Sequence, residues 1–315
     1  MRKNENKVHI EGRVYEHTLE VKTVQNKDSQ NFGKSYISGS ISVATDEAGL
    51  NIIPVNFTYV TENTKAGGKN KTYAELMKII TLNNTWLTKG PTEAIKVVID
   101  TSLAVNDFVS KEGTMVCQTI HNGGFVSIVS ELNENEALRN TFKADVVINN
   151  VTMKEADPEK HIDCDHLVVR GLVFDFRNAV QPVEFVISHP QGMQYFESLD
   201  ASPSNPIYTN IWGKINFKSI STEITQESAF GEAAVTVSKR KEKKWEITGS
   251  NKVPYDFGEE KVMTAQELMK ALQDREVHLA EVKKQREEYE AKKNASTTNN
   301  FVPVVSTGET PEFVF

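Results

Sequence analysis

Residues 36–45 read YISGSISVAT, a run in which apolar residues and glycine alternate with serine. One face of an extended chain would carry Ile37, Gly39, Ile41 and Val43. Alternation with a period of two is typical of a β-strand that buries one face and exposes the other. A glycine inside such a strand indicates a tight bend or a close approach of another backbone segment. We therefore predict a strand here that belongs to a strongly curved sheet.

Four more strands and one helix are predicted around this stretch. The strands cover residues 8–24, 51–61, 94–105 and 114–130, and the helix is TYAELMKIIT at 72–81. Thr72 and Glu75 have the spacing of a capping box at the start of that helix. The order is strand, strand, strand, helix, strand, strand. A long first strand and a helix between the third and fourth strands are typical of the OB fold, a five-stranded Greek-key barrel.

The same order of elements returns in the second half of the chain. Strands are predicted at 142–155, 166–176, 180–189, 207–222 and 232–249, with a short helix at 190–200. The two halves share no convincing residue-by-residue identity, so the pattern of elements alone indicates the duplication. The predicted fold class is mostly β, with two tandem OB-type five-stranded barrels, a C-terminal helix and a flexible tail.

The predicted domains follow from this pattern and from a change of composition after Pro254. They are a first OB-like barrel at 1–132, a second at 140–252, a charged helix at 262–293 and a flexible acidic and aromatic tail at 294–315. Thr264 and Glu267 have capping-box spacing at the start of the charged helix. Because Arg275 and Arg286 interrupt its apolar stripe, a long coiled coil is not expected. The helix either packs one face on a barrel or protrudes.

The charge balance excludes nucleic-acid binding through bulk charge alone. The chain of 315 residues has 36 basic and 43 acidic side chains, a formal net charge of -7. Residues 1–252 hold 28 basic and 31 acidic side chains, so more than half of the excess lies after residue 252. A nearly neutral body with an acidic C-terminal part can still present a basic groove.

The compartment is expected to be the cytoplasm. No apolar run approaches the roughly 20 residues that a membrane-spanning helix needs, and the N-terminus lacks the apolar region of a secretory signal. The only two cysteines, Cys117 and Cys164, fall in different predicted domains. Free thiols in a reducing compartment, and no membrane association, are therefore expected.

The sequence lacks the common catalytic motifs GxxxxGK(S/T), GxSxG and HExxH. We therefore predict that the protein is not an enzyme and uses no cofactor. Residues 161–166 read HIDCDH and combine residue types that ligate metals. Neighbouring residues of a strand point to opposite faces, and adjacent residues rarely close a tetrahedral site. We interpret this segment as a polar loop before a strand and predict no metal.

Binding signals are stronger than catalytic ones. Proteins that bind single strands without sequence preference combine a positive groove for phosphates with aromatic rings on which bases stack. The predicted nucleic-acid-binding residues are Arg13, Tyr15, Phe32, Lys34, Tyr36, Arg170, Tyr208, Trp212, Lys214, Lys218, Lys239, Arg240, Lys241, Lys243, Lys244 and Trp245.

Two stretches dominate this set. Within 208–218, an apolar face alternates with a second face that holds Tyr208, Trp212, Lys214 and Lys218. The alternative is that a third element covers Trp212. The run KRKEKKW at 239–245 places basic side chains beside a tryptophan, although such a run is usually only a solvated face.

Other aromatic positions are assigned to the core, left open or placed in a loop. Phe57 and Tyr59 follow the apolar alternation of the third strand and are expected in the core. Either face of the strand that holds Arg170 and Phe174 could be buried. Phe32 and Lys34 lie in the loop between the first two strands, which commonly closes over ligand in this fold.

The chain resembles single-stranded DNA-binding proteins of the OB-fold class, particularly the replication type encoded by bacteriophages. The resemblance covers the strand pattern of 1–250 and the tail at 294–315. In that class a disordered tail ends in acidic residues, a proline and a terminal phenylalanine, and recruits replication and repair enzymes. Here residues 308–315 read GETPEFVF, with two acids and with Val314 where the family has proline. The resemblance implies partner binding by Glu309, Glu312, Phe313 and Phe315.

The leading hypothesis is non-catalytic, largely sequence-independent binding of single-stranded DNA in replication, recombination and repair, with the tail recruiting enzymes. If the chain is phage-encoded, it would act in the cytoplasm of the host cell. Tandem barrels depart from the usual single-barrel tetramer of the family and could replace some of its oligomerisation, and a homo-oligomer is kept among the expected partners. One alternative is a structural or virion-assembly protein that uses its barrels for protein contacts. Another is an accessory module that loads or regulates a helicase or polymerase.

Overall fold

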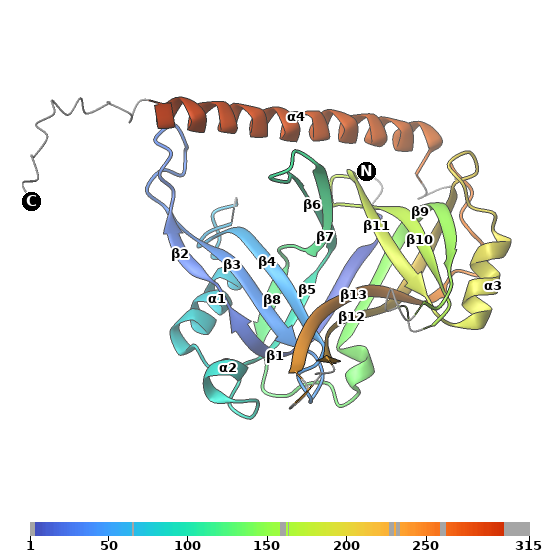
Figure 1. The fold of residues 1–315 in the computed structure, drawn as a ribbon. Helices are drawn as coiled ribbons and strands as arrows, with labels where there is room; N and C mark the ends of the chain where they lie inside the picture. Colours follow the sequence, from blue (N-terminus) through green and yellow to red (C-terminus); the bar gives the residue numbers. More distant parts are fainter. Residues whose placement is uncertain are drawn as a thin grey trace, which may run out of the picture.

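The computed structural model describes residues 4–64, 66–157, 162, 164–226, 230, 234–258 and 263–298 (Figure 1). Of residues 219–226, 234–241 and 293–298 only the backbone is described. The predicted fold class is confirmed, with two closed five-stranded barrels and a C-terminal helix. The predicted flexible tail lies outside the described residues from 299 on.

The first barrel closes in the order typical of an OB fold. Its strands are β1 (Asn6–His17), β3 (Ser35–Ala44), β4 (Ile52–Thr61), β5 (Lys96–Thr101) and β8 (Phe125–Ile128). β1 pairs with β3 and β5, β3 pairs with β4, and β5 pairs with β8, all antiparallel. A parallel bridge between Asn56 and Asn122 brings the chain just before β8 against β4 and closes the ring. Helices α1 (Lys71–Leu82) and α2 (Trp86–Lys89) lie between β4 and β5.

The second barrel repeats this topology. Its strands are β9 (Asn140–Lys154), β10 (His166–Phe174), β11 (Val180–Ile187), β12 (Ile207–Gln226) and β13 (Ala234–Ser250). β9 pairs with β10 and β12, and β11 meets β13 in parallel at Val186 and Glu246. Helix α3 (Pro190–Ser198) lies between β11 and β12, as α1 lies between β4 and β5. A parallel contact closes each five-stranded ring, between β11 and β13 in the second barrel and between β4 and the residue Asn122 before β8 in the first.

The strands predicted at 94–105 and 114–130 are each broken in two. Their inner parts, β6 (Leu103–Val109) and β7 (Met115–His121), leave the first barrel as a separate hairpin. Gly124 permits the break before β8, because its φ is +112° and a Cβ there would lie 2.2 Å from the carbonyl oxygen of Asp100. Two smaller elements, β2 (Glu20–Thr23) and η1 (Glu136–Leu138), complete the first half and the connection to the second barrel.

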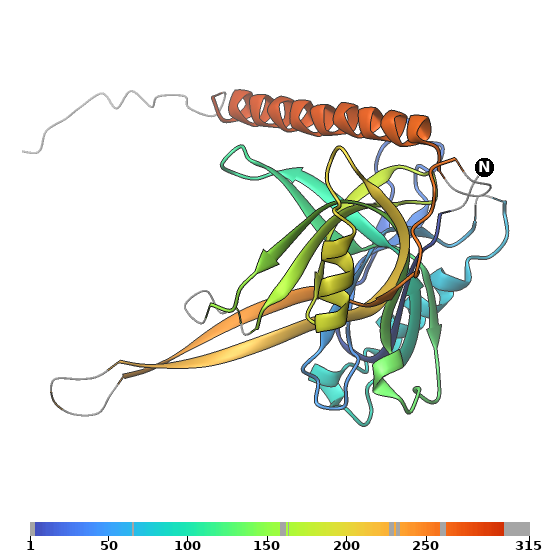
Figure 2. The ribbon, with the colours of Figure 1, turned by 90° about the vertical axis from the view of Figure 1, so that its right-hand side faces the viewer.

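The two barrels share one sheet. β1 pairs antiparallel with β9, from Asn6 opposite Ala144 to Ile10 opposite Asn140. As a result the hairpin β6–β7 packs on β11 of the second barrel, and β12 contacts β4 of the first. The hairpin β12–β13 also projects well beyond the two barrels (Figure 2). Segments of each barrel, the hairpin β6–β7 and strand β12, therefore lie against the other barrel.

Helix α4 (Ala265–Thr298) crosses the two barrels as a separate layer (Figures 1 and 2). The predicted capping box at its start is present, since Thr264 N–H donates to Glu267 Oε2 at 2.8 Å and Glu267 N–H donates to Thr264 Oγ1 at 3.2 Å. Arg275 binds Asp107 of β6 at 2.7 Å. The sequence predicted a capping box for α1 as well, but there Asn70 is the N-cap and Thr72 is buried.

Apolar side chains of both barrels form one core. Ile10, Ile41 and Phe57 of the first barrel and Phe142 and Phe185 of the second belong to the same buried cluster. The rings of Phe142 and Phe185 stack at 5.4 Å. A second cluster lies where the start of α4 covers the second barrel, and it contains Val147, Leu172, Phe174, Val180, Tyr208, Met263 and Leu268.

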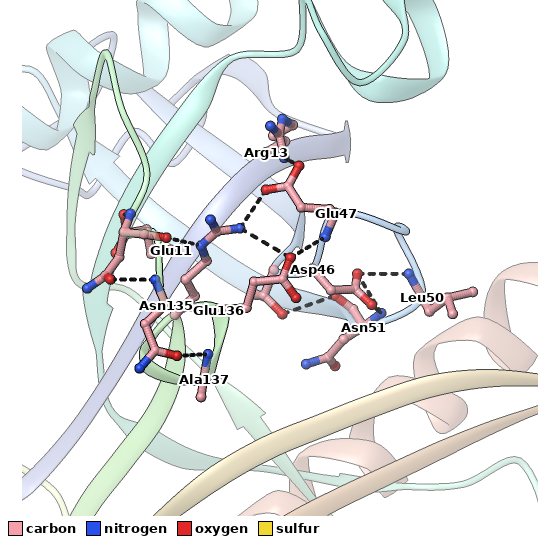
Figure 3. Close-up of polar contacts among 12 residues, drawn as sticks. Glu11, Arg13, Asp46, Glu47, Leu50, Asn51, Asn135, Glu136 and Ala137 are labelled. Carbon is pink, nitrogen blue, oxygen red and sulfur yellow. Dashed lines mark hydrogen bonds and ion pairs between the residues drawn. The ribbon is translucent and has the colours of Figure 1, made fainter.

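A network of charged side chains joins β1, the β3–β4 turn and the connection between the barrels (Figure 3). Glu47 binds Arg13 at 2.7 Å and Arg139 at 2.8 Å, and these two guanidinium groups hold the pKa of its carboxyl below the ordinary value. Arg139 is almost fully buried and donates from Nε to the carbonyl of Asn133 at 2.6 Å. The network fixes the turn of the first barrel against the linker to the second.

Asn51, at the end of that turn, bonds directly to the second barrel. Its Nδ2 donates to the carbonyl of Ile215 at 3.0 Å, and its Oδ1 accepts from Phe217 N–H at 2.7 Å. Asn140 also donates to the carbonyl of Ile215, at 2.7 Å. If Asn51 were lost, the carbonyl of Ile215 would still accept from Asn140. The buried N–H of Phe217 would lose its acceptor.

We expect Asn51→Ala to lower the free energy of unfolding by about 2 to 3 kcal/mol, because it orphans one buried N–H and removes two hydrogen bonds. Urea denaturation followed by tryptophan fluorescence measures the change. Asn106→Ala is the matched control, since Asn106 is exposed and its side chain makes no hydrogen bond to any described residue. Equal stability of the two variants would contradict the role assigned to Asn51.

Candidate functional site

An open hollow of about 660 Å³ lies over strands β3 and β4 of the first barrel. Its walls come from β7 on one side and from β12 and β13 of the second barrel on the other. The lining residues are Thr18, Ser38, Gly39, Ser40, Pro54, Asn56, Phe57, Thr58, Asn106, Gln118, Thr119, Ile120, His121, Asn122, Phe217 and Lys243. β3 and β4 are the second and third strands of the barrel, and this face is where OB folds bind oligonucleotides and oligosaccharides.

A second hollow of about 340 Å³ continues the first. The two share Pro54, Phe217 and Lys243, and the second adds Tyr15 of β1 and Lys218 of β12. We call the two hollows together the trough. The structure thus brings together three residues that the sequence predicted separately, Tyr15, Lys218 and Lys243, from both barrels.

Two tyrosines lie close together on the outside of β3 and β4. The ring centroids of Tyr36 and Tyr59 are 4.6 Å apart, and Tyr59 is 47% exposed. The prediction that Tyr59 belongs to the core is wrong. Between the pairs Ile37–Val60 and Gly39–Phe57, two residues of β4 lie opposite one residue of β3. This β-bulge reverses the alternation after Phe57, which is buried as predicted, and turns Tyr59 outward.

The floor of the trough is an aromatic cluster that connects the two barrels. His121 of β7 lies 5.6 Å from Phe217 and 5.9 Å from Trp245, measured between ring centroids. Trp245 Nε1 donates to His121 Nε2 at 3.2 Å, and His121 Nδ1 lies 3.2 Å from the carbonyl of Pro54. Because an indole N–H can only donate, the proton of the neutral imidazole is on Nδ1, which donates to Pro54. Burial lowers the pKa of His121 to about 4.

The trough carries little charge. None of the described residues that line the larger hollow has a carboxylate, and Lys243 is its cation. Lys243 lies 5.7 Å from the ring centroid of Phe217. In the smaller hollow, Lys218 and Lys243 accompany Glu16 and Glu242. Both lysines are exposed, so their ammonium groups are accessible from solvent.

Three predicted contact residues lie elsewhere. Tyr208 is buried, because Tyr255 and Phe257 of the segment before α4 cover it. Trp245 is buried beside His121 and cannot stack on a base. Arg13 is held by Glu47, with its side chain only 16% exposed. These predictions are corrected because each side chain is already engaged within the protein.

Trp212 is 40% exposed and lies against Gly249, where a Cβ would come within 2.4 Å of the indole Nε1. It precedes Phe217 by five residues, about 17 Å along the strand. Trp212 is therefore an exposed aromatic residue outside the trough.

The other predicted residues are distributed over both barrels. Arg170 pairs with Glu184 at 3.0 Å on the corresponding face of the second barrel. Lys214 is half-buried, and Lys244 is half-buried and pairs with Glu242 at 2.6 Å. Phe32 is 50% exposed and Lys34 is exposed in the connection between β2 and β3, which adjoins Tyr36.

The remaining predicted positions fall partly or wholly outside the described residues. The backbones of Lys239, Arg240 and Lys241 pair with β12 opposite residues 219–221, but their side chains are not described. The tail residues Glu309, Glu312, Phe313 and Phe315 lie outside the described residues. So do His161 and Asp163 of the HIDCDH segment. Among the residues that are described, no group of three metal-ligating side chains comes together.

Sequence reasoning missed the neutral polar side chains of the trough. Asn56, Asn106 and Gln118 line it from three different strands. Single carboxamides of this kind give no motif in a sequence, and only the hairpin β6–β7 brings the last two over β4. For Asn56 a signal existed, since it alternates with buried Val55 and Phe57 and so lies on the outer face of β4.

Comparisons with known proteins give the following results. A family model described as YorF matches residues 4–285. No curated protein matches the sequence. The solved structures that are similar include a deletion mutant of the single-stranded DNA binding protein from Thermus aquaticus, at 11% identity over 82% of this chain and 98% of that chain, with a TM-score of 0.47.

Another similar structure is a replication protein A heterotrimer bound to single-stranded DNA, at 11% identity over 78% of this chain and 50% of that chain, with a TM-score of 0.21. Both TM-scores are below 0.5, so the OB assignment rests on the strand pairing described above. Within the described residues, no helix is both long and apolar enough to cross a membrane.

The buried imidazole makes stability depend on pH. The pKa of His121 is about 4 in the folded protein, against an ordinary value of 6.5. Between pH 4 and pH 6.5 the imidazole is therefore protonated in the unfolded chain and neutral in the folded protein. The contribution of this group to the free energy of unfolding is fully present above pH 6.5 and falls as the pH is lowered toward 4. The expected loss over this window is about 3 kcal/mol from this group.

His121→Gln should remove that part of the pH dependence, while its stability at pH 8 falls because the bridge between the barrels is lost. Urea denaturation at a series of pH values measures both effects. His189→Gln is the matched control, since His189 is exposed. A pH profile of His121→Gln that parallels the parent profile would contradict the assignment.

Proposed function

The chain belongs to the YorF family, and from its fold and its trough we propose that it binds single-stranded DNA without catalysing a reaction. The observation that carries the proposal is the open trough on the β3–β4 face, with a half-buried and an exposed tyrosine on those strands and exposed lysines from β12 and β13. This face and the loops around it are the ligand site of OB folds.

The tyrosine pair favours an unpaired strand over a duplex. Tyr59 presents its ring to solvent, and Tyr36 lies beside it. Bases stack on such rings at about 1–3 kcal/mol each, and this requires faces that are not already stacked inside a duplex. Lys218 and Lys243 favour a polyanionic strand over an oligosaccharide, because a neutral sugar chain has no phosphate for them to bind.

The path of the strand follows from the order of these groups. The bases would lie over β3 and β4 from Tyr36 toward Phe217, and the phosphates would pass Lys218 and Lys243. Tyr15 would contribute a third ring at the far end of the trough. Phe32 and Lys34 would contact the strand where it leaves Tyr36. Arg170, Lys214 and the basic residues 239–241 of β13 extend the proposal to the second barrel.

We further propose that the protein acts in DNA replication, recombination and repair in the cytoplasm, that of the host if a phage encodes it. The tail residues Glu309, Glu312, Phe313 and Phe315 would recruit partner enzymes. This part of the proposal rests on the resemblance of the sequence GETPEFVF to the tails of OB-fold single-stranded DNA-binding proteins. Self-association into a homo-oligomer is compatible with it.

Replacing both tyrosines, Tyr36→Ala with Tyr59→Ala, should weaken binding of a fluorescent oligonucleotide by at least about ten-fold, since stacking is worth about 1–3 kcal/mol per base. Fluorescence anisotropy measures the affinity. Tyr289→Ala is the matched control, because Tyr289 is 59% exposed on α4. An unchanged affinity of the double variant would remove these tyrosines from the site, and binding of duplex as tightly as of single strands would contradict the proposed function.

Deletion of residues 308–315 should leave oligonucleotide affinity unchanged and abolish binding to the polymerase or helicase of the same replication system. The physical reason is that the tail supplies the aromatic and acidic groups for the partner, whereas the trough supplies those for DNA. Isothermal titration of each purified enzyme with the parent and truncated proteins measures the difference. Equal binding by both forms would contradict the role proposed for the tail.

A further inference from the structure

Three carboxamide side chains face the trough without a partner in the protein. Asn56 lies on β4, Asn106 on β6 and Gln118 on β7, and all three line the larger hollow. Asn106 and Gln118 are exposed and lie directly opposite each other in the hairpin. None of the three amide groups is hydrogen-bonded to another described residue. Each therefore offers one acceptor and two donors to a ligand.

The hairpin that carries two of these groups is held in place from its other face. Asp107, next to Asn106, binds Arg275 of α4 at 2.7 Å, and its side chain is only 4% exposed. The N–H of Val105 donates to Gln181 Oε1 of β11 at 3.0 Å. Because side chains alternate along a strand, fixing Asp107 against α4 directs Asn106 into the trough. The two carboxamides are thus presented by a rigid support.

The chemistry of this wall differs from that of a phosphate-binding groove. The described lining of the larger hollow has one lysine, no arginine and no carboxylate. A neutral amide contributes little to counterion release, which comes from lysine and arginine on phosphates. Carboxamides instead match the paired donor and acceptor atoms on the edges of nucleobases, as in the bidentate contact of Asn or Gln with adenine.

On the basis of the proposed function, we infer that the trough reads the edges of unpaired nucleobases through Asn56, Asn106 and Gln118, so that binding prefers some bases over others. The bases enter the hollow between the β3–β4 face and the hairpin β6–β7. The phosphates stay at the rim, near Lys218 and Lys243. Binding then depends weakly on salt and measurably on base composition.

The test compares homopolymers of thymidine, deoxycytidine and deoxyadenosine of about twelve nucleotides, a length within the usual range of OB sites. We expect the tightest and weakest dissociation constants to differ by at least about five-fold, the lower end of what bidentate base contacts give. A twelve-nucleotide strand in the trough has Lys218 and Lys243 as its phosphate contacts, so the slope of log affinity against log salt should be about -1.4.

The triple variant Asn56→Ala, Asn106→Ala, Gln118→Ala should reduce the preference among homopolymers to less than about two-fold, since the base-edge contacts are gone. Its salt slope should stay as in the parent. Lys243→Gln should do the opposite, lowering the slope by about 0.7 and keeping the preference. The matched control replaces three exposed carboxamides of α4, as Gln266→Ala, Gln273→Ala, Gln285→Ala, and should retain both properties.

Equal affinity for the three homopolymers, or a preference that survives the triple variant, would overturn base-edge reading while leaving single-strand binding intact. Failure of the parent protein to bind any homopolymer at low salt would instead overturn the proposed function itself. To separate loss of contacts from loss of fold, the isosteric pair Asn106→Asp, Gln118→Glu is measured as well. It removes the donors while preserving shape, so it too should change the order of base preference.

Discussion

The antiparallel pairing of β1 with β9 determines how the rest of the molecule is assembled. Asn6 to Ile10 pair with Asn140 to Ala144, so the first strands of the two barrels belong to one hydrogen-bonded ladder. Because this ladder is antiparallel, β1 and β9 run in opposite directions. Each barrel has a hairpin with a strand that contacts the other barrel. The hairpin β6–β7 packs on β11, and β12 contacts β4. The trough exists because these contacts wall the β3–β4 face from two sides.

The equivalent face of the second barrel is less available. The hairpin β6–β7 stands against β11, and a hollow of about 310 Å³ remains there, lined by Cys117, Arg170 and Glu184 among others. Arg170 and Glu184 pair with each other, whereas the carboxamides of the first face have no partner in the described protein. Duplication of the barrel has thus produced two different faces, and the first is the better suited to a ligand.

The sequence was sufficient for the fold class, because alternation and element order survive in both halves. It failed where one residue shifts the alternation or where a distant segment covers a face. The bulge in β4 exposes Tyr59, and Tyr255 buries Tyr208. Trp245 was assigned to the basic run before it, although its alternation with buried Ile247 indicated the core. The ion pair of Arg13 with Glu47 could not be predicted, since Glu47 lies in the β3–β4 turn, far from Arg13 in the sequence.

The same geometry bears on the proposal that this acidic chain binds a polyanion. With a net charge of -7, long-range attraction does not bring DNA to the surface. What remains is short-range chemistry, in which a neutral His121 keeps a positive charge out of the floor and unpaired amides replace cations on the wall. In a site of this kind, counterion release contributes less to the affinity and contacts with bases contribute more. Under the proposed function, base selectivity would reside in the walls, which come from β6–β7 and the second barrel, and not in the barrel face that is common to all OB folds.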